Sequence, residues 1–367
     1  MSRPIRAIIC KSALAHNIQL IQSRNPDKHC MAVVKADAYG HRLNAVIDGL
    51  KPADGLAILE IHKAVELRQL GWTKPILLLE GLFHLDDFKL AIEHQLDWVI
   101  HCQAQLDFLV QCTAAQVSSY RPRIYLKLNT GMNRLGFPIA QAPQAIAQLD
   151  AWAKALGCPS PVLMTHFANA DAPTDQQNGV EVQAQHQALF KLKPADWASS
   201  LGNSAGALNW SALSGDIIRP GIAIYGASPG PLDAASYGLK PVMEFQTEVI
   251  ALQDVPKGAK VGYGSRWQAP RDSKIAVIAC GYADGYPRHA PDCTPVVVNG
   301  QMAALAGRVS MDMMTVDITG LHGIQTGSTV ELWGNQLPVD VVAQQAGTIS
   351  YELLCALAPR VPFTLKD

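Results

Sequence analysis

Lys35 is the residue whose surroundings most favour covalent chemistry. It follows an apolar run at residues 31–34 that predicts a short buried strand, and it precedes a turn at Tyr39 and Gly40. A lysine held at a strand end among apolar residues is costly to keep charged, so it tends to lose its proton and become nucleophilic. Such a lysine suits a Schiff base with a carbonyl compound, although a lone lysine past a strand is more often an ordinary surface residue.

Two turns rich in small residues give a second chemical signal. G-N-S-A-G spans residues 202–206 and R-P-G-I spans residues 219–222, and each follows a short apolar run. Backbone N–H groups and a serine hydroxyl at such turns can hold a phosphate. Either turn alone could be an ordinary glycine turn, but together with the strand-end lysine they indicate a phosphorylated cofactor.

A series of apolar runs must position these residues. The runs lie at residues 31–34, 55–59, 75–79, 97–100, 124–128, 162–167, 197–201 and 217–224. Amphipathic stretches separate them, after a first helix that we expect Ser12 to cap and Pro26 to close. Eight strands alternating with helices in about 200 residues predict a parallel (β/α)8 barrel. No G-x-G-x-x-G follows the first strand, which disfavours an open dinucleotide-binding sheet.

The carboxyl ends of the strands are where barrels of this kind hold their active sites. The residues at or just beyond the expected strand ends include Lys35, Tyr39, Arg134, His166, Asn203, Ser204, Arg219 and Gly221. Their common location is a geometric reason to expect one site there.

The sequence changes character after about Gly230. From Phe245 onward, runs of Val, Ile and Thr are punctuated by Gly and Pro, which is typical of a mainly antiparallel β domain. P-G-P at residues 229–231 is typical of a linker. We therefore expect two domains, a barrel at residues 1–230 and a β domain at residues 231–367.

The composition argues against several kinds of partner. The chain has 367 residues, is 49% apolar and carries a net charge of -1 without a block of basic residues, so we expect no nucleic-acid or membrane partner. No segment has the length of a membrane span and the N-terminus lacks a signal-peptide core, which predicts a cytoplasmic protein. The cysteines and histidines are scattered without zinc-site spacing, so we expect reduced thiols and no metal site.

K-A-D-A-Y-G-H at residues 35–41 resembles the cofactor-lysine motif of the alanine racemases, pyridoxal phosphate enzymes built from a barrel and a β domain. The resemblance covers nearly the whole chain, because M-T-H-F, R-P-G-I, V-G-Y-G-S-R-W, S-M-D and I-S-Y-E match as well. It implies that the strand at residues 7–10 packs with the second domain. It also implies that pyridoxal 5'-phosphate binds to Lys35.

The resemblance assigns a set of residues to this cofactor. They are Lys35, Tyr39, His166, Asn203, Ser204, Arg219, Gly221, Ile222 and Tyr351. Ser204 and the amides of Gly221 and Ile222 would hold the phosphate, with phenol contacts from the two tyrosines. Arg219 would face the pyridine nitrogen, to which a guanidinium cannot give up its proton. The ring is then a weaker electron sink, which favours returning a proton to the same carbon.

Inverting a carbon needs a proton removed on one face and another delivered on the opposite face. The resemblance gives these two roles to Lys35 and Tyr263. A tyrosine with an ordinary pKa of about 10 needs a cationic or hydrogen-bonding neighbour to act as a base. His166 holds the family position that is linked to Tyr263 and Arg219. By itself, Tyr263 would be an ordinary turn aromatic.

The substrate carboxylate is implied to bind Arg134 and the backbone N–H of Met311. Lys127 matches a lysine that is often carbamylated in relatives and then orients Arg134, and we treat this modification as a hypothesis. Asn129 stands where many relatives have an aspartate, and we expect little effect. The supporting residues that the resemblance implies are Lys127, Asp312 and, along the substrate channel, Asp171, Tyr282, Arg288 and Arg308.

Tyr263 and Met311 belong to the expected β domain, whereas Lys35 belongs to the barrel. In the resembled family such residues meet only across a head-to-tail homodimer, so shared active sites are predicted. The implied reaction interconverts L-alanine and D-alanine, for peptidoglycan synthesis or alanine catabolism. A broader amino-acid racemase is the nearest alternative. A related decarboxylase, a cofactor carrier made of a bare barrel and a Schiff-base aldolase fit the sequence less well.

Overall fold

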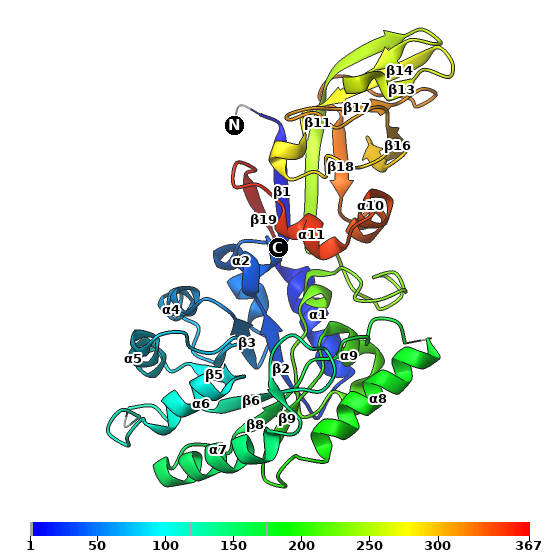
Figure 1. Cartoon of the computed structure of the whole chain (residues 1–367). Coiled ribbons are helices and arrows are strands. Elements are labelled where there is room, and N and C mark those ends of the chain that lie inside the picture. The colour runs from blue at the N-terminus through cyan, green and yellow to red at the C-terminus, as the bar shows by residue number, and fades with distance from the viewer. Residues whose placement is uncertain (1–2, 118, 174) are drawn as a thin grey trace.

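Two lobes lie end to end in the computed structural model, which describes residues 3–117, 119–173 and 175–367 (Figure 1). One lobe is a barrel of parallel strands in the order β10-β2-β3-β4-β5-β6-β8-β9. The strands are β2 (His29–Val33), β3 (Gly55–Ile58), β4 (Ile76–Leu78), β5 (Asp97–Ile100), β6 (Ile124–Asn129), β8 (Val162–Met164), β9 (Ala198–Ser200) and β10 (Ile217–Ile218), and the short β7 (Phe137–Pro138) pairs with β6. The predicted barrel is confirmed, in a nearly closed form.

The seam of the barrel lies between β9 and β10. There the N–H of Asp216 donates to Ser199 (2.9 Å) and the N–H of Arg219 donates to the carbonyl of Gly202 (2.8 Å). The run at residues 217–224 was expected to be one strand, and this is wrong beyond Ile218. Pro220 has no N–H for a strand ladder, and the chain turns into the 3-10 helix η3 (Ile222–Tyr225).

Helices surround this barrel. They are α1 (Lys11–Ser23), α2 (Lys35–Tyr39), α3 (Leu43–Val46), α4 (Ile61–Gln69), α5 (Leu85–Glu93), α6 (Gln103–Val110), α7 (Ala142–Leu156), α8 (Gln176–Phe190) and α9 (Ser204–Asn209), with the 3-10 helices η1 (Ile47–Leu50), η2 (Ser211–Leu213) and η3. The expected cap at Ser12 is wrong. Because β1 runs directly into α1, Cys10 occupies the cap position, and the helix ends at Ser23 before Pro26.

The second lobe is a mainly antiparallel β sheet. Its strands are β1 (Ile5–Cys10), β11 (Met243–Val255), β14 (Ser273–Ile278), β15 (Pro295–Val298), β16 (Gln301–Leu305), β17 (Met314–Asp317), β18 (Thr329–Trp333) and β19 (Phe363–Lys366). The long β11 pairs with both β18 and β14, so β11, β14, β17, β16, β15 and β18 close into a ring. The remaining elements are the hairpin β12 (Lys260–Val261) and β13 (Trp267–Gln268), η4 (Tyr263–Ser265), η5 (Tyr282–Asp284), α10 (Val339–Ala346) and α11 (Ser350–Cys355).

Both ends of the chain join this second sheet. β1 pairs with β11 in antiparallel orientation and with β19 in parallel orientation. The N-terminal strand therefore lies beside strands that follow more than 200 residues later in the sequence. The domain boundary at residue 230 stays a prediction. Among the described residues, no helix is long and apolar enough to cross a membrane, and no cluster of three or more His, Cys, Asp or Glu could hold a metal ion.

Candidate active site

Lys35 begins α2 immediately after β2, at the carboxyl end of the barrel. The next four residues, 36–39, have φ between 52° and 56°, so α2 is a left-handed turn. This backbone costs non-glycine residues about 1–2 kcal/mol each. The carboxylate of Asp37 holds the turn, because it accepts from the N–H of Leu43 (2.9 Å) and from Arg42 (3.1 Å). The turn expected at Tyr39 and Gly40 thus starts earlier, at residue 36.

An aromatic stack fixes Tyr39 beside this lysine. Its ring lies 4.9 Å from that of Tyr225 and 5.9 Å from that of Tyr351, which α11 supplies. His41 stacks on the far side of Tyr225 (4.6 Å), whose hydroxyl donates to the carbonyl of Val33 (3.0 Å). Burial raises the pKa of Tyr39, and burial with nearby Asp171 raises the pKa of Tyr351 to about 12. Both phenols are therefore neutral hydrogen-bond donors near neutral pH.

Ser204 forms a small polar cradle with the turn that precedes η3. Its Oγ accepts from the N–H groups of Gly221 (2.8 Å) and Ala223 (3.2 Å). A Cβ at Gly221 would lie 2.3 Å from the hydroxyl of Tyr39, so only glycine allows this approach. The hydroxyls of Ser204 and Tyr39 thus lie beside the backbone amides of this turn, a donor set that suits a phosphate, and Ile222 is buried between Gly221 and Ala223.

Arg219 is buried at the end of β10 and is fixed by three partners. It donates to Ser200 Oγ (2.5 Å), to the carbonyl of Thr165 (2.9 Å) and to Nδ1 of His166 (3.4 Å). Burial lowers the pKa of Arg219 to about 10, so the guanidinium stays charged at neutral pH. Burial and the charge of Arg219 lower the pKa of His166, which is therefore neutral and has Nε2 3.5 Å from Nδ2 of Asn203.

Lys127 points into the same barrel and is 7% exposed. Burial, Arg219 and Arg134 together lower the pKa of Lys127 to about 8. A small cavity joins this lysine to Arg134, Thr165 and His166. A fraction of Lys127 is thus a neutral amine near neutral pH.

A larger cavity, ≈ 880 Å³, opens between this end of the barrel and the α10–α11 segment. It contains His166, Asn203, Asp171 and Tyr351. The C-terminal segment therefore forms one wall of the mouth, although it lies far from the barrel strands in sequence.

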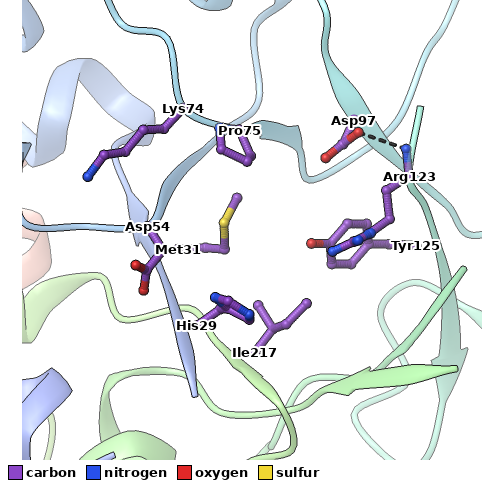
Figure 2. Close-up of a pocket in the computed structure, with 9 residues that line it drawn as sticks. All are labelled: His29, Met31, Asp54, Lys74, Pro75, Asp97, Arg123, Tyr125 and Ile217. Carbon is purple, nitrogen blue, oxygen red and sulfur yellow. Dashed lines mark hydrogen bonds between the residues drawn. The ribbon is translucent and has the colours of Figure 1, made fainter. Parts of the chain in front are cut away.

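The amino ends of the strands enclose a different cavity, ≈ 330 Å³ (Figure 2). Asp97 lies at its edge and accepts from the N–H of Arg123 (2.8 Å) and from the hydroxyl of Tyr120 (2.7 Å). In the same way, Asp54 accepts from the N–H of Cys30 (2.8 Å). These carboxylates satisfy backbone amides at the starts of neighbouring strands, which is a structural role.

In the part of the chain that the structure describes, no hydrogen bond or ion pair joins Lys35 to the predicted residues of the β lobe. They are Tyr263, Tyr282, Arg288, Arg308, Met311 and Asp312. Tyr263 is 70% exposed and Met311 is 53% exposed. In the described part of the chain, no hydrogen bond or ring contact joins either residue to the barrel mouth. The β12–β13 hairpin beside Tyr263 lies at the far end of the β lobe from α2 (Figure 1).

Sequence reasoning missed several residues that hold the site together. They are Asp37, Thr165, Ser200 and Tyr225. A signal was available for Thr165 and Ser200, because each is a polar residue in or next to an apolar strand. Tyr225 gave no such signal, since it resembles any aromatic of the core.

A barrel whose mouth holds a strand-end lysine, a polar turn that suits a phosphate and a buried arginine, followed by a closed β lobe, is typical of a class of two-domain barrel enzymes. The family "Alanine racemase, N-terminal domain" matches residues 9–229, and "Alanine racemase, C-terminal domain" matches residues 242–365. The chain belongs to the alanine racemase family.

Similar proteins cover the whole length of this chain. The alanine racemase of Nitrosomonas eutropha is 45% identical over 99% of both chains, and that of a Janthinobacterium species is 47% identical over 98% of both. The crystal structure of the biosynthetic alanine racemase of Pseudomonas aeruginosa is 40% identical, covers all of both chains and has a TM-score of 0.91. That of Bartonella henselae, with covalently bound pyridoxal phosphate, is 25% identical over 99% of both chains with a TM-score of 0.86.

Proposed function

We propose that this protein is a pyridoxal 5'-phosphate-dependent alanine racemase that interconverts L-alanine and D-alanine. The observation that carries the proposal is Arg219, a buried cation fixed at the same barrel mouth as Lys35. Arg219 would face the pyridine nitrogen of the cofactor and keep its own proton. In the decarboxylase alternative an acidic residue is expected at that position, so Arg219 disfavours it. The second lobe disfavours a carrier made of a bare barrel.

The donor set at the mouth supports this cofactor. The amine comes from Lys35, and the phosphate donors come from Ser204, the Gly221 turn and Tyr39. When bound, pyridoxal phosphate supplies a carbonyl group for an amine and a conjugated ring that makes the α-proton of the substrate more acidic.

Two bases complete the reaction. The amine of Lys35 accepts the α-proton on one face of the substrate, and the phenol of Tyr263 delivers a proton on the other. After one turnover Lys35 has gained a proton and Tyr263 has lost one, so the reverse transfer is ready on the same groups. The substrate carboxylate binds Arg134 and the amide of Met311, with Lys127 behind Arg134.

A homodimer completes each site. The exposure of Tyr263 and Met311 in one chain supports this arrangement, because neither residue has reached the barrel mouth on its own. Asp171 and the partner subunit's Tyr282, Arg288, Arg308 and Asp312 line or support the substrate channel. We place the reaction in the cytoplasm, where it supplies D-alanine for peptidoglycan or serves alanine catabolism.

A single assay tests the proposal. Purified protein is incubated with L-alanine and pyridoxal phosphate, and both D-alanine and the visible absorbance band of the lysine-bound cofactor are followed. We expect both in the wild type and neither in Lys35→Ala. Tyr263→Phe should keep the band but slow α-proton exchange unequally for the two enantiomers. Tyr237→Phe serves as the control, because the Tyr237 hydroxyl hydrogen-bonds Asn209 (3.0 Å).

The band without D-alanine would reject alanine as the substrate. Racemisation of L-serine in the same assay would then favour the broader amino-acid racemase. Absence of the band and of both products would overturn the proposal.

A further inference from the structure

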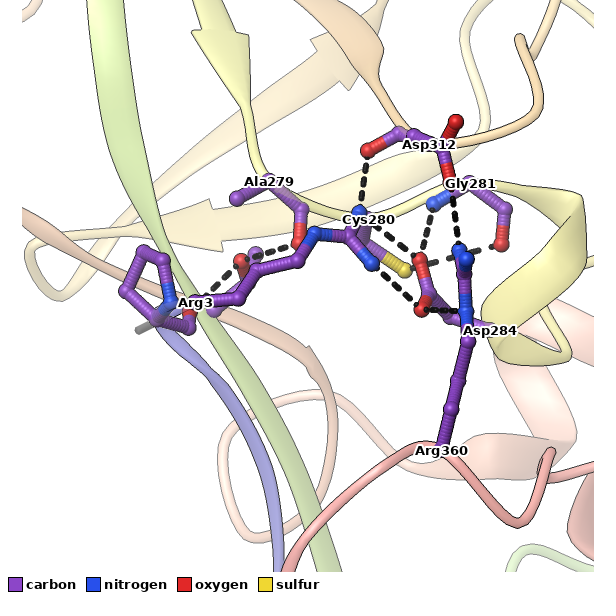
Figure 3. Close-up of polar contacts among 9 residues, drawn as sticks. Arg3, Ala279, Cys280, Gly281, Asp284, Asp312 and Arg360 are labelled. Carbon is purple, nitrogen blue, oxygen red and sulfur yellow. Dashed lines mark hydrogen bonds and ion pairs between the residues drawn. The ribbon is translucent and has the colours of Figure 1, made fainter. Parts of the chain in front are cut away.

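Asp284 is a fully buried carboxylate in the β lobe, outside all the site residues predicted from the sequence. Arg3 donates to both of its oxygens (2.7 and 3.0 Å), and Arg360 donates to one (2.8 Å). The N–H of Gly281 donates to the second oxygen (2.9 Å). A buried carboxylate needs such complete pairing, because an unpaired one is strongly destabilising. The cluster therefore ties together three segments that are far apart in the sequence (Figure 3).

The same two arginines hold the loop at residues 310–313. Arg3 donates to the carbonyl of Asp312, and Arg360 donates to its carboxylate (2.7 Å). Figure 3 shows both guanidinium groups between Asp284 and Asp312. Each arginine thus contacts both the η5 turn and the loop, which links the two segments.

The backbone reinforces this coupling. The N–H groups of Tyr282 and Ala283 donate to the carbonyls of Ser310 and Met311, each at 3.0 Å. A Cβ at Gly281 would lie 2.3 Å from the Met311 carbonyl, so the two segments pack too closely for any other residue. The side chain of Met311, at the tip of this rigid loop, is nevertheless 53% exposed.

We propose that Arg3 and Asp284 are positioning residues that fix Met311 and Tyr282 for binding substrate at the barrel of the partner subunit. Neither residue touches the substrate, and the inference rests on the proposed function because it assumes that Met311 borders a substrate site. The cofactor is held by the barrel. Loosening the loop therefore weakens substrate binding and leaves the cofactor in place.

Arg3→Ala is the variant that tests the inference. It removes the bidentate contact to Asp284 and the contact to Asp312 but leaves Arg360 to neutralise the buried carboxylate. We expect KM for alanine to rise about tenfold while kcat changes less than about threefold. The absorbance band of the bound cofactor should stay unchanged. Arg3→Lys keeps the positive charge but cannot make the bidentate contact, so its KM should lie between those of the wild type and Arg3→Ala.

Hydrogen exchange measured by mass spectrometry supplies a readout that does not depend on activity. In Arg3→Ala, amides at residues 281–286 and 308–314 should exchange faster, while those of the barrel stay as in the wild type. Arg6→Ala is the matched control, because Arg6 is a nearby arginine on β1 whose side chain donates to Gln246 (3.4 Å).

Three results would overturn the inference. They are unchanged KM and exchange in Arg3→Ala, a fall in kcat alone, and faster exchange throughout the chain, which would indicate a purely structural role. If the wild type racemised no amino acid, the proposed function would fail, but the exchange experiment would still decide whether Arg3 couples the two segments.

Discussion

At the scale of residues, the barrel mouth is crowded with positive charge. Lys127 lies near Arg134, Arg219 and Lys35, and burial together with these cations lowers its pKa to about 8. The pKa of His166 is lowered by burial and by the same neighbours, so it adds no further charge at neutral pH. A mouth of this kind favours anionic groups, such as a phosphate and the carboxylate of an amino acid.

The lowered pKa leads to a prediction for Lys127. Only the neutral amine reacts with CO2, so we expect Lys127 to carry a carbamate, whose negative charge would pair with Arg134. Because deprotonation precedes the reaction, occupancy should rise as the pH increases through about 8. Mass spectrometry and NMR with isotopically labelled bicarbonate measure it. The exposed Lys154, whose pKa is raised by its hydrogen bond with Asp150, should stay unlabelled.

Lys127→Ala provides the functional counterpart. We expect KM for alanine to rise about tenfold, because in the proposed site Lys127 orients Arg134 toward the substrate carboxylate. Absence of label on Lys127 at every pH would contradict the carbamate hypothesis.

At the scale of elements, the left-handed turn α2 places Lys35 and Tyr39, which we assign to the cofactor site. It carries Lys35 and Tyr39 to the same mouth within five residues, at an energetic cost that four successive positive φ values impose. The turn is stable because several contacts around it offset this cost. Asp37 bonds ahead to Leu43, and the aromatic stack with Tyr225 covers Tyr39.

Removing the Asp37 carboxylate should destabilise the left-handed turn α2. We expect Asp37→Ala to lower the free energy of unfolding by about 1–2 kcal/mol, because the N–H of Leu43 and the charge of Arg42 lose their partner. It should also speed release of the cofactor. Asp37→Asn keeps a hydrogen-bond acceptor for the N–H of Leu43, so its free energy of unfolding should fall less than that of Asp37→Ala. Thermal unfolding with and without cofactor, and decay of the visible band, measure both effects.

Asp48→Ala is the matched control for this prediction. Asp48 is an exposed aspartate of the same lobe that pairs with Lys51 (2.7 Å), and exposed pairs contribute little. Equal effects of Asp37→Ala and Asp48→Ala would show that Asp37 does not hold the turn.

At the scale of the whole molecule, the residues that we assign to one site lie on two separate lobes of the chain. The barrel mouth holds Lys35 and Arg219, whereas Tyr263 and Met311 stand exposed on the other lobe. In the proposed homodimer, pairing with a second copy would bring these two surfaces together in a symmetric pair of sites.

Mixing two inactive variants tests this arrangement. Lys35→Ala and Tyr263→Phe subunits, dissociated and recombined, should form heterodimers in which one site has both native residues. Random pairing predicts about a quarter of the wild-type activity. The separate variants, treated in the same way, are the controls. No recovery in heterodimers verified by mass spectrometry would indicate that Lys35 and Tyr263 act within one subunit.

Much of the fold follows from local patterns. The strand at residues 97–100 has the bounds that its apolar run predicts, because a buried parallel strand needs only a short continuous apolar segment. The prediction of one strand at residues 217–224 was wrong, because an apolar run alone does not show where a proline ends the hydrogen bonding of a strand. The prediction that Ser12 caps the first helix was also wrong, because the helix start is set by the direct junction of β1 with α1.

The sequence by itself determined the alternation of strands and helices, the position of Lys35 at a strand end and the two glycine turns, because periodicity and glycine chemistry act over a few residues. Only the tertiary structure decided that α2 is left-handed, that Tyr351 packs on Tyr39, and that Arg3 and Arg360 meet at Asp284. Those features depend on side-chain contacts, most of them between segments far apart in the sequence, which compensate local strain and buried charge and leave no periodic trace in the chain.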